Sequence, residues 1–94
     1  MTVFTAITLH HPAPEHVEPL TQFMRDVIGA LRDAPGLVDA HVARASDGSL
    51  LAGVTSWASA ADFDRARPTI LAYAPQRDAP WPVEPDQAIR LEAI

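Results

Sequence analysis

Residues 37–57 read LVDAHVARASDGSLLAGVTSW. Two apolar, β-branched runs, 37–45 and 50–57, flank the turn Ser46-Asp47-Gly48-Ser49, and Asp-Gly between such runs is typical of a β-hairpin. If Asp47 and Gly48 form the turn, the numbers of paired residues sum to 95, so that Val38 faces Trp57. This stretch therefore predicts two neighbouring antiparallel strands.

The sequence on either side of the hairpin predicts a strand and a helix before it and a helix and a strand after it. Residues 3–10 are β-branched and apolar and indicate a strand. Apolar residues then recur at helical spacing up to Pro35-Gly36, with Pro19 early enough to be tolerated; they are Val17, Leu20, Met24, Val27, Ile28 and Leu31. A capping pattern, Ser59 to Asp62, starts a second helix that we expect to be interrupted at Pro68. Residues 74–87 contain four prolines and predict an irregular connection, and residues 88–93 predict the last strand.

This order of elements predicts one α+β domain over residues 1–94 with the ferredoxin-like β-α-β-β-α-β fold. The sheet of that fold has four antiparallel strands, and its first and third strands are central. The charges agree with this arrangement, because the strand around Asp39 and Arg44 and the strand around Arg90 and Glu92 are the predicted edges.

The hairpin register also predicts a homodimer. One sheet face receives the helices and carries Val38, Ala40, Val42, Leu51, Gly53, Thr55 and Trp57. The other face is too apolar to remain in water and carries Leu37, Asp39, His41, Ala43, Leu50, Ala52, Val54 and Ser56. No third layer is left to cover that face, so we expect a second copy to pack on it, with Arg90 and Glu92 pairing with the partner.

Composition and charge exclude several classes of function. The 94 residues include no cysteine, and the net charge is -5 with seven scattered arginines and no lysine. A nucleic-acid partner and an anionic membrane are therefore not expected, and no apolar run reaches the roughly 18 residues of a membrane span. The start of the chain lacks the pattern of a signal peptide, so we expect a cytoplasmic protein.

The whole chain resembles the antibiotic biosynthesis monooxygenase family of the dimeric α+β barrel superfamily. The resemblance rests on the length, the order of elements and the stretch Val54-Thr-Ser-Trp57-Ala-Ser59-Ala-Ala-Asp-Phe63. A tryptophan that ends the third strand, a small polar residue that opens the next helix and an aromatic residue six positions after the tryptophan are typical of that family.

The resemblance implies oxidation of polycyclic phenols by O2 without metal or flavin: the substrate is deprotonated and its carbanion gives an electron to oxygen. It also implies that Trp57, with Tyr73 and polar strand residues, lines the pocket. Haem-degrading relatives have an asparagine on the first strand and a histidine after the tryptophan. This chain has Thr5 on the first strand and no histidine in the second helix, which argues against haem degradation.

Candidate site residues follow from these patterns. We expect Trp57, Tyr73 and His11 to be catalytic, with His11 as the general base at the end of the first strand. The residues expected to bind a flat aromatic molecule are Thr5, Gly53, Thr55, Phe63 and Trp81. A plain core tryptophan at Trp57 and a solvated turn histidine at His11 are the alternatives. No metal site is expected, because His10 and His11 point to opposite faces of a strand and no carboxylate–histidine cluster is evident.

Three functions remain open from the sequence. The first is a cofactor-independent monooxygenase acting on a flat aromatic or quinone-like molecule. The second is a non-catalytic dimeric module that binds a small hydrophobic metabolite, and the third is an isomerase or lyase on the same fold. Trp81 lies within the proline-rich connection, which either closes over the pocket or packs elsewhere on the protein.

Overall fold

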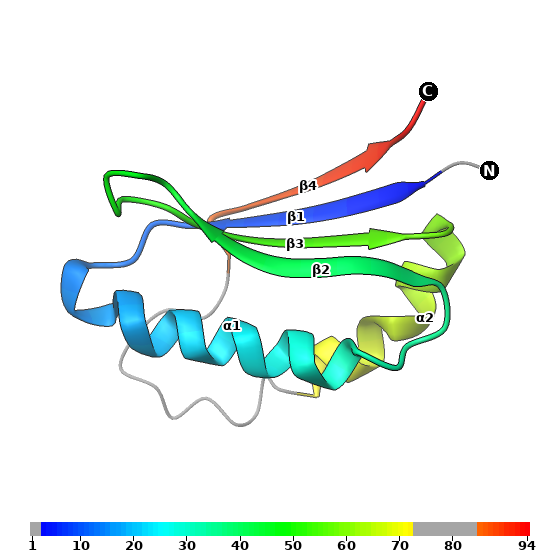
Figure 1. Cartoon of the computed structure of the whole chain (residues 1–94), viewed down its shortest axis with the longest axis horizontal. Helices are drawn as coiled ribbons and strands as arrows, with labels where there is room; N and C mark the ends of the chain where they lie inside the picture. Colours follow the sequence, from blue (N-terminus) through cyan, green and yellow to red (C-terminus); the bar gives the residue numbers. More distant parts are fainter. Residues whose placement is uncertain (1–2, 73–84) are drawn as a thin grey trace.

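The computed structural model describes residues 3–72 and 85–94, and the predicted order of elements is confirmed (Figure 1). The elements are β1 (Phe4–His10), the 3-10 turn η1 (Pro14–His16), α1 (Val17–Leu31), β2 (Leu37–Arg44), β3 (Leu51–Trp57), α2 (Ala60–Leu71) and β4 (Gln87–Glu92). Tyr73 and Trp81 lie outside the described residues.

The sheet has the strand order β2-β3-β1-β4, and every neighbouring pair is antiparallel. The two apolar strands, β1 and β3, are therefore central, and the strands that carry charged side chains form the edges. This confirms the ferredoxin-like α+β fold.

The hairpin register is as predicted over most of its length. From the pair Asp39–Ser56 to the pair Arg44–Leu51, the residue numbers of partners sum to 95. The loop has four residues and not two, because the last hydrogen bond before it runs from the Ala45 amide to the Leu50 carbonyl. The prediction was wrong at the open end, where the register shifts between Leu37 and Asp39. A bulge lets the strand twist while Leu37 takes the place opposite Trp57. Val38 is left 61% exposed instead of packing under the helices.

The two helices begin where the sequence indicated. Pro19 lies in the first turn of α1, where backbone amides have no intrahelical acceptor, so it removes no hydrogen bond. The Ser59 hydroxyl caps α2 by accepting a hydrogen bond from the Asp62 amide at 3.2 Å. We expected Pro68 to kink or restart this helix, and α2 continues through Pro68 to Leu71 without a restart.

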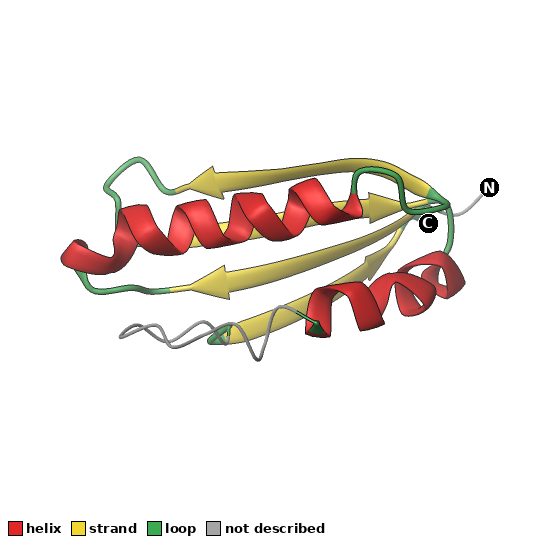
Figure 2. Cartoon of the chain, turned by 90° about the horizontal axis from the view of Figure 1, so that it is seen from below, coloured by secondary structure: helices red, strands yellow, loops and turns green. Residues whose placement is uncertain are grey.

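Both helices cover the same face of the sheet, as Figures 1 and 2 show. One core cluster contains Phe4, Leu31, Trp57 and Ala66, and a second contains Leu20, Met24 and Leu51. In the described part of the chain, no helix is long and apolar enough to cross a membrane.

The other face of the sheet is covered by no element of residues 3–72 or 85–94. Its central row contains Val54, Ile7 and Ile89, which are direct cross-strand partners. His41 extends this row onto β2, on the face where it was predicted to lie.

Candidate functional site

Trp57 ends β3 beneath the helices and is fully buried. Its indole N–H donates to the Thr55 hydroxyl at 2.9 Å, so the polar group of the ring is satisfied without a ligand. The ring meets Phe63 of α2 edge-on at a centroid distance of 5.9 Å, and Phe63 lies 5.4 Å from Phe4. In this structure protein atoms therefore fill the space around Trp57.

Arg90 lies against this aromatic cluster. Its guanidinium lies 5.1 Å from the ring centre of Phe63 and 5.9 Å from that of Phe4, and 3.7 Å separate it from the Asp64 carboxylate. Arg90 thus has an acidic and two aromatic neighbours within the chain, and its pairing with a partner chain stays a prediction. Arg90 pairs with Ala6 on the helix-covered face, which the sheet separates from the uncovered face.

Small side chains lie in the middle of the covered face, between the two core clusters. Gly53 pairs with Thr8 on β1. A methyl group on Gly53 would come within 2.8 Å of the Thr8 hydroxyl and 3.3 Å of the terminal methyl group of Met24. The Thr8 hydroxyl and the end of the Met24 side chain thus both lie beside the position that a side chain at Gly53 would occupy.

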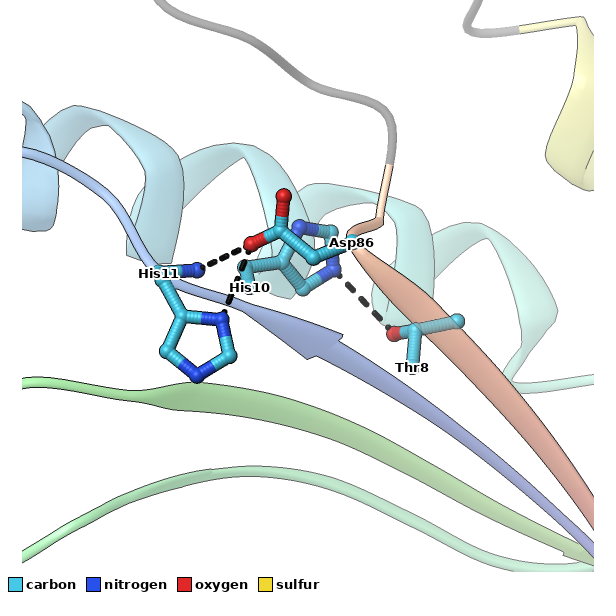
Figure 3. A network of polar contacts seen from close by, with 4 residues as sticks. All are labelled: Thr8, His10, His11 and Asp86. Atoms are coloured by element: carbon cyan, nitrogen blue, oxygen red, sulfur yellow. Dashed lines mark hydrogen bonds and ion pairs between the residues drawn. The ribbon is translucent and has the colours of Figure 1, made fainter.

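His10 is the buried ionisable side chain of the described residues, at 6% exposure. It lies on the covered face opposite Leu51, and its Nε2 atom is 3.2 Å from the Thr8 hydroxyl (Figure 3). A histidine and a hydroxyl that share a hydrogen bond inside an apolar layer can hold and move a proton.

His11 points out of the sheet end instead. Its Nδ1 atom and its backbone amide lie 3.0 and 2.8 Å from the same oxygen of Asp86 (Figure 3). These hydrogen bonds, the side-chain one first, lower the pKa of the Asp86 carboxyl. The pair has the orientation of an acid–base dyad, but the His11 side chain is 60% exposed, so solvent weakens the interaction between the two groups.

The structure brings together only part of the candidate set. Trp57, Thr55, Gly53 and Phe63 share the covered side of the sheet. His11 lies beyond the other end of β1, roughly 20 Å from Trp57 at strand spacing. Thr5 lies on the uncovered face, where its hydroxyl is 3.2 Å from that of Ser56. His11 and Thr5 are therefore unable to contact one small ligand together with Trp57.

Sequence reasoning missed the Thr8–His10 pair and the role of Asp86. The alternation of β1 carried the signal for the pair, because residues 4, 6, 8 and 10 share the face of Trp57 once Phe4 is placed in the core. No local signal connects Asp86 with His11, which lies 75 residues away in the sequence.

Two hollows among the described residues lie away from Trp57. One, of about 560 Å³, lies along α1 and includes Arg25 and Arg44 in its lining. The other, of about 270 Å³, lies between the end of α1 and α2 and includes Asp33, Asp62 and Arg65. Within residues 3–72 and 85–94, no three His, Asp or Glu side chains lie close enough together to hold a metal ion.

No family model and no curated protein matches the sequence. Solved structures do match. Among them are two proteins whose names include the words antibiotic biosynthesis monooxygenase. The protein from Chloroflexus aurantiacus J-10-fl has a TM-score of 0.71 at 16% identity, over 98% of this chain and 93% of that one. The protein from Nitrosomonas europaea has a TM-score of 0.74 at 14% identity, over 97% and 88%. Rv0793 from Mycobacterium tuberculosis has a TM-score of 0.75 at 19% identity, over 98% and 95%. The chain therefore has the fold of proteins so named.

Proposed function

We propose that this protein is a cofactor-independent monooxygenase that oxidises a flat aromatic molecule with O2. The observation that carries the proposal is the covered sheet face, where an aromatic cluster at Trp57 and a buried hydrogen-bonded pair, Thr8 and His10, lie along the same two central strands with the small residue Gly53 between them. The shared fold with proteins named as antibiotic biosynthesis monooxygenases supports it at the level of fold.

The chemistry suited to such a site converts an activated ring methylene group into a carbonyl group, with one molecule of O2 consumed and one molecule of water released. Loss of one proton gives a carbanion that the aromatic rings stabilise, and this carbanion transfers one electron to O2. The two radicals combine into a peroxide, which takes up a proton and loses water. The protein has to bind the flat rings, accept the first proton and keep bulk water out.

The residues at hand match these tasks by type. Phe4, Phe63 and Trp57 offer apolar ring surfaces, and the Thr55 hydroxyl and the Thr8–His10 pair offer hydrogen bonds. Because Trp57 is fully packed in this structure, a ligand in contact with it has to displace other side chains.

We further propose that the protein acts as a homodimer that buries the uncovered sheet face. The direct partners Val54, Ile7 and Ile89 give this face an apolar centre, and Leu91 beside them is 50% exposed. A second copy with the same surface would cover it by two-fold symmetry.

Oxygen uptake with anthrone tests the proposed activity. Anthrone has an acidic methylene group between two aromatic rings, and we expect uptake above the protein-free rate with formation of anthraquinone. Binding of the aromatic without oxygen uptake would instead support the non-catalytic binding module.

Tryptophan fluorescence tests the place of binding. In Trp81→Phe the emission comes from Trp57 alone, so an aromatic ligand that binds beside Trp57 should still quench it. In Trp57→Phe, where Trp81 is the remaining tryptophan, the response to the ligand should vanish or weaken sharply. A Trp57→Phe variant that binds the ligand with unchanged affinity would remove Trp57 from the site.

A further inference from the structure

The burial of His10 is energetically unfavourable for folding. Burial of an imidazole within an apolar layer disfavours its charged form and requires a hydrogen-bond partner. The Thr8 hydroxyl, two residues away on the same face of β1, is such a partner. An apolar residue would fill the same place beside Leu51 without that requirement.

The Thr8 hydroxyl lies between His10 and the centre of the covered face. On one side it is 3.2 Å from His10 Nε2, and on the other it lies above Gly53, whose missing side chain leaves the hydroxyl room. The end of the Met24 side chain lies over the same glycine. Met24 belongs to the buried cluster with Leu20 and Leu51, so a ligand that reaches the hydroxyl has to displace the end of its unbranched, flexible side chain.

We propose that Thr8 and His10 form a proton relay that takes the acidic proton of the aromatic substrate, an inference that rests on the proposed function. The substrate proton passes to the Thr8 oxygen while the Thr8 hydroxyl proton passes to His10 Nε2. The products of this step are the substrate anion and the His10 imidazolium, so charge and protons balance.

Charged neighbours of His10 bear on this role. Asp86, whose carboxyl pKa is lowered mainly by its hydrogen bonds from His11, also interacts electrostatically with His10. Arg44 lies in the same cross-strand row, on the far side of Leu51. His11 follows directly in the chain but is exposed and held by Asp86, outside the covered face. The structure thus favours His10 over His11 as the base.

Kinetics of three variants test the relay. With anthrone, Thr8→Val and His10→Gln should each lower kcat by about 100-fold or more, the usual contribution of a positioned base. Thr8→Ser keeps the hydroxyl and should retain most of the activity. The fall of kcat at acidic pH, which reports protonation of the base, should disappear in His10→Gln. If Thr8→Val and His10→Gln keep the wild-type kcat and pH profile, the relay is refuted while the proposed oxidation stands.

A binding experiment separates the relay from the oxygenase activity. The probe 2-hydroxyanthraquinone has an acidic hydroxyl group that forms no intramolecular hydrogen bond, and it has no methylene group to oxidise. Its addition should shift the His10 imidazole 15N resonances, assigned by their loss in His10→Gln, and leave those of His41 unchanged. This shift should persist in Thr8→Ser and be absent in Thr8→Val. Ligand binding without any shift at His10 overturns the relay, whether or not the wild type consumes oxygen with anthrone.

Discussion

Gly36 offers the sharpest test of how this chain connects its first helix to the sheet. The residue follows α1 with a φ of 85°, and its carbonyl accepts a hydrogen bond from the Ala58 amide at 2.8 Å. A β-carbon placed on Gly36 would lie 2.6 Å from the Asp62 β-carbon and closer still to its carboxylate. Substitution by alanine therefore meets two separate obstacles.

The cost of Gly36→Ala can be worked out from these two obstacles. A left-handed backbone costs a residue with a β-carbon about 1–2 kcal/mol. The overlap with Asp62 adds about 1–3 kcal/mol, as for other overpacked sites, because Asp62 is held by Ser59 and Arg65. The total is about 2–5 kcal/mol, a large share of the 5–15 kcal/mol that is usual for a domain.

Gly48→Ala is the matched control. Gly48 has nearly the same φ, 80°, but no atom lies within 4 Å of the place of its β-carbon. Only the backbone cost of about 1–2 kcal/mol should remain. Urea unfolding followed by circular dichroism at one protein concentration measures both variants against the wild type. Equal losses in the two variants would show that the contact between Gly36 and Asp62 does not constrain the fold.

Three further outcomes are expected. Val54→Asp places a charge at the centre of the uncovered face and should abolish the dimer, because an unpaired charge in the interface would weaken dimerisation by about 3–5 kcal/mol. Sedimentation velocity at micromolar concentration measures the mass, and a variant that keeps twice the chain mass would contradict the proposed interface. Gly53→Ala should lower the free energy of unfolding by about 1–3 kcal/mol, because the new methyl group overlaps Thr8. The control Gly29→Ala, at a solvent-exposed helix position, should raise it by about 0.5–1 kcal/mol. A Gly53→Ala variant that is as stable as the wild type in urea would argue against close packing at Gly53. Asp86→Asn should destabilise the protein at neutral pH. The pKa of Asp86 is lowered in the folded protein, so its stabilising contribution is present above the unfolded pKa of about 3.9 and is lost as the pH falls through the folded value. The stabilities of the wild type and of Asp86→Asn should therefore converge in acid. A difference in stability that does not depend on pH would contradict this prediction.

The sequence alone determined the order of elements, the two central strands and most of the hairpin register. These features depend on neighbours in the chain: the Asp47-Gly48 turn, the period of apolar residues and the Ser59 cap each act within a few residues. The face that carries Trp57 followed from the same register, because side chains alternate along a strand.

Only the tertiary structure decided which of the candidate residues meet. It placed Asp86 against His11, stacked Arg90 over Phe63 and moved Leu37 in place of Val38 by a bulge. It also placed His11 at the end of the sheet far from Trp57, a separation that depends on how β1 pairs with β3. Contacts of this kind join segments that are distant in the sequence. They depend on the packing of whole helices and strands, for which no short stretch of sequence holds the information.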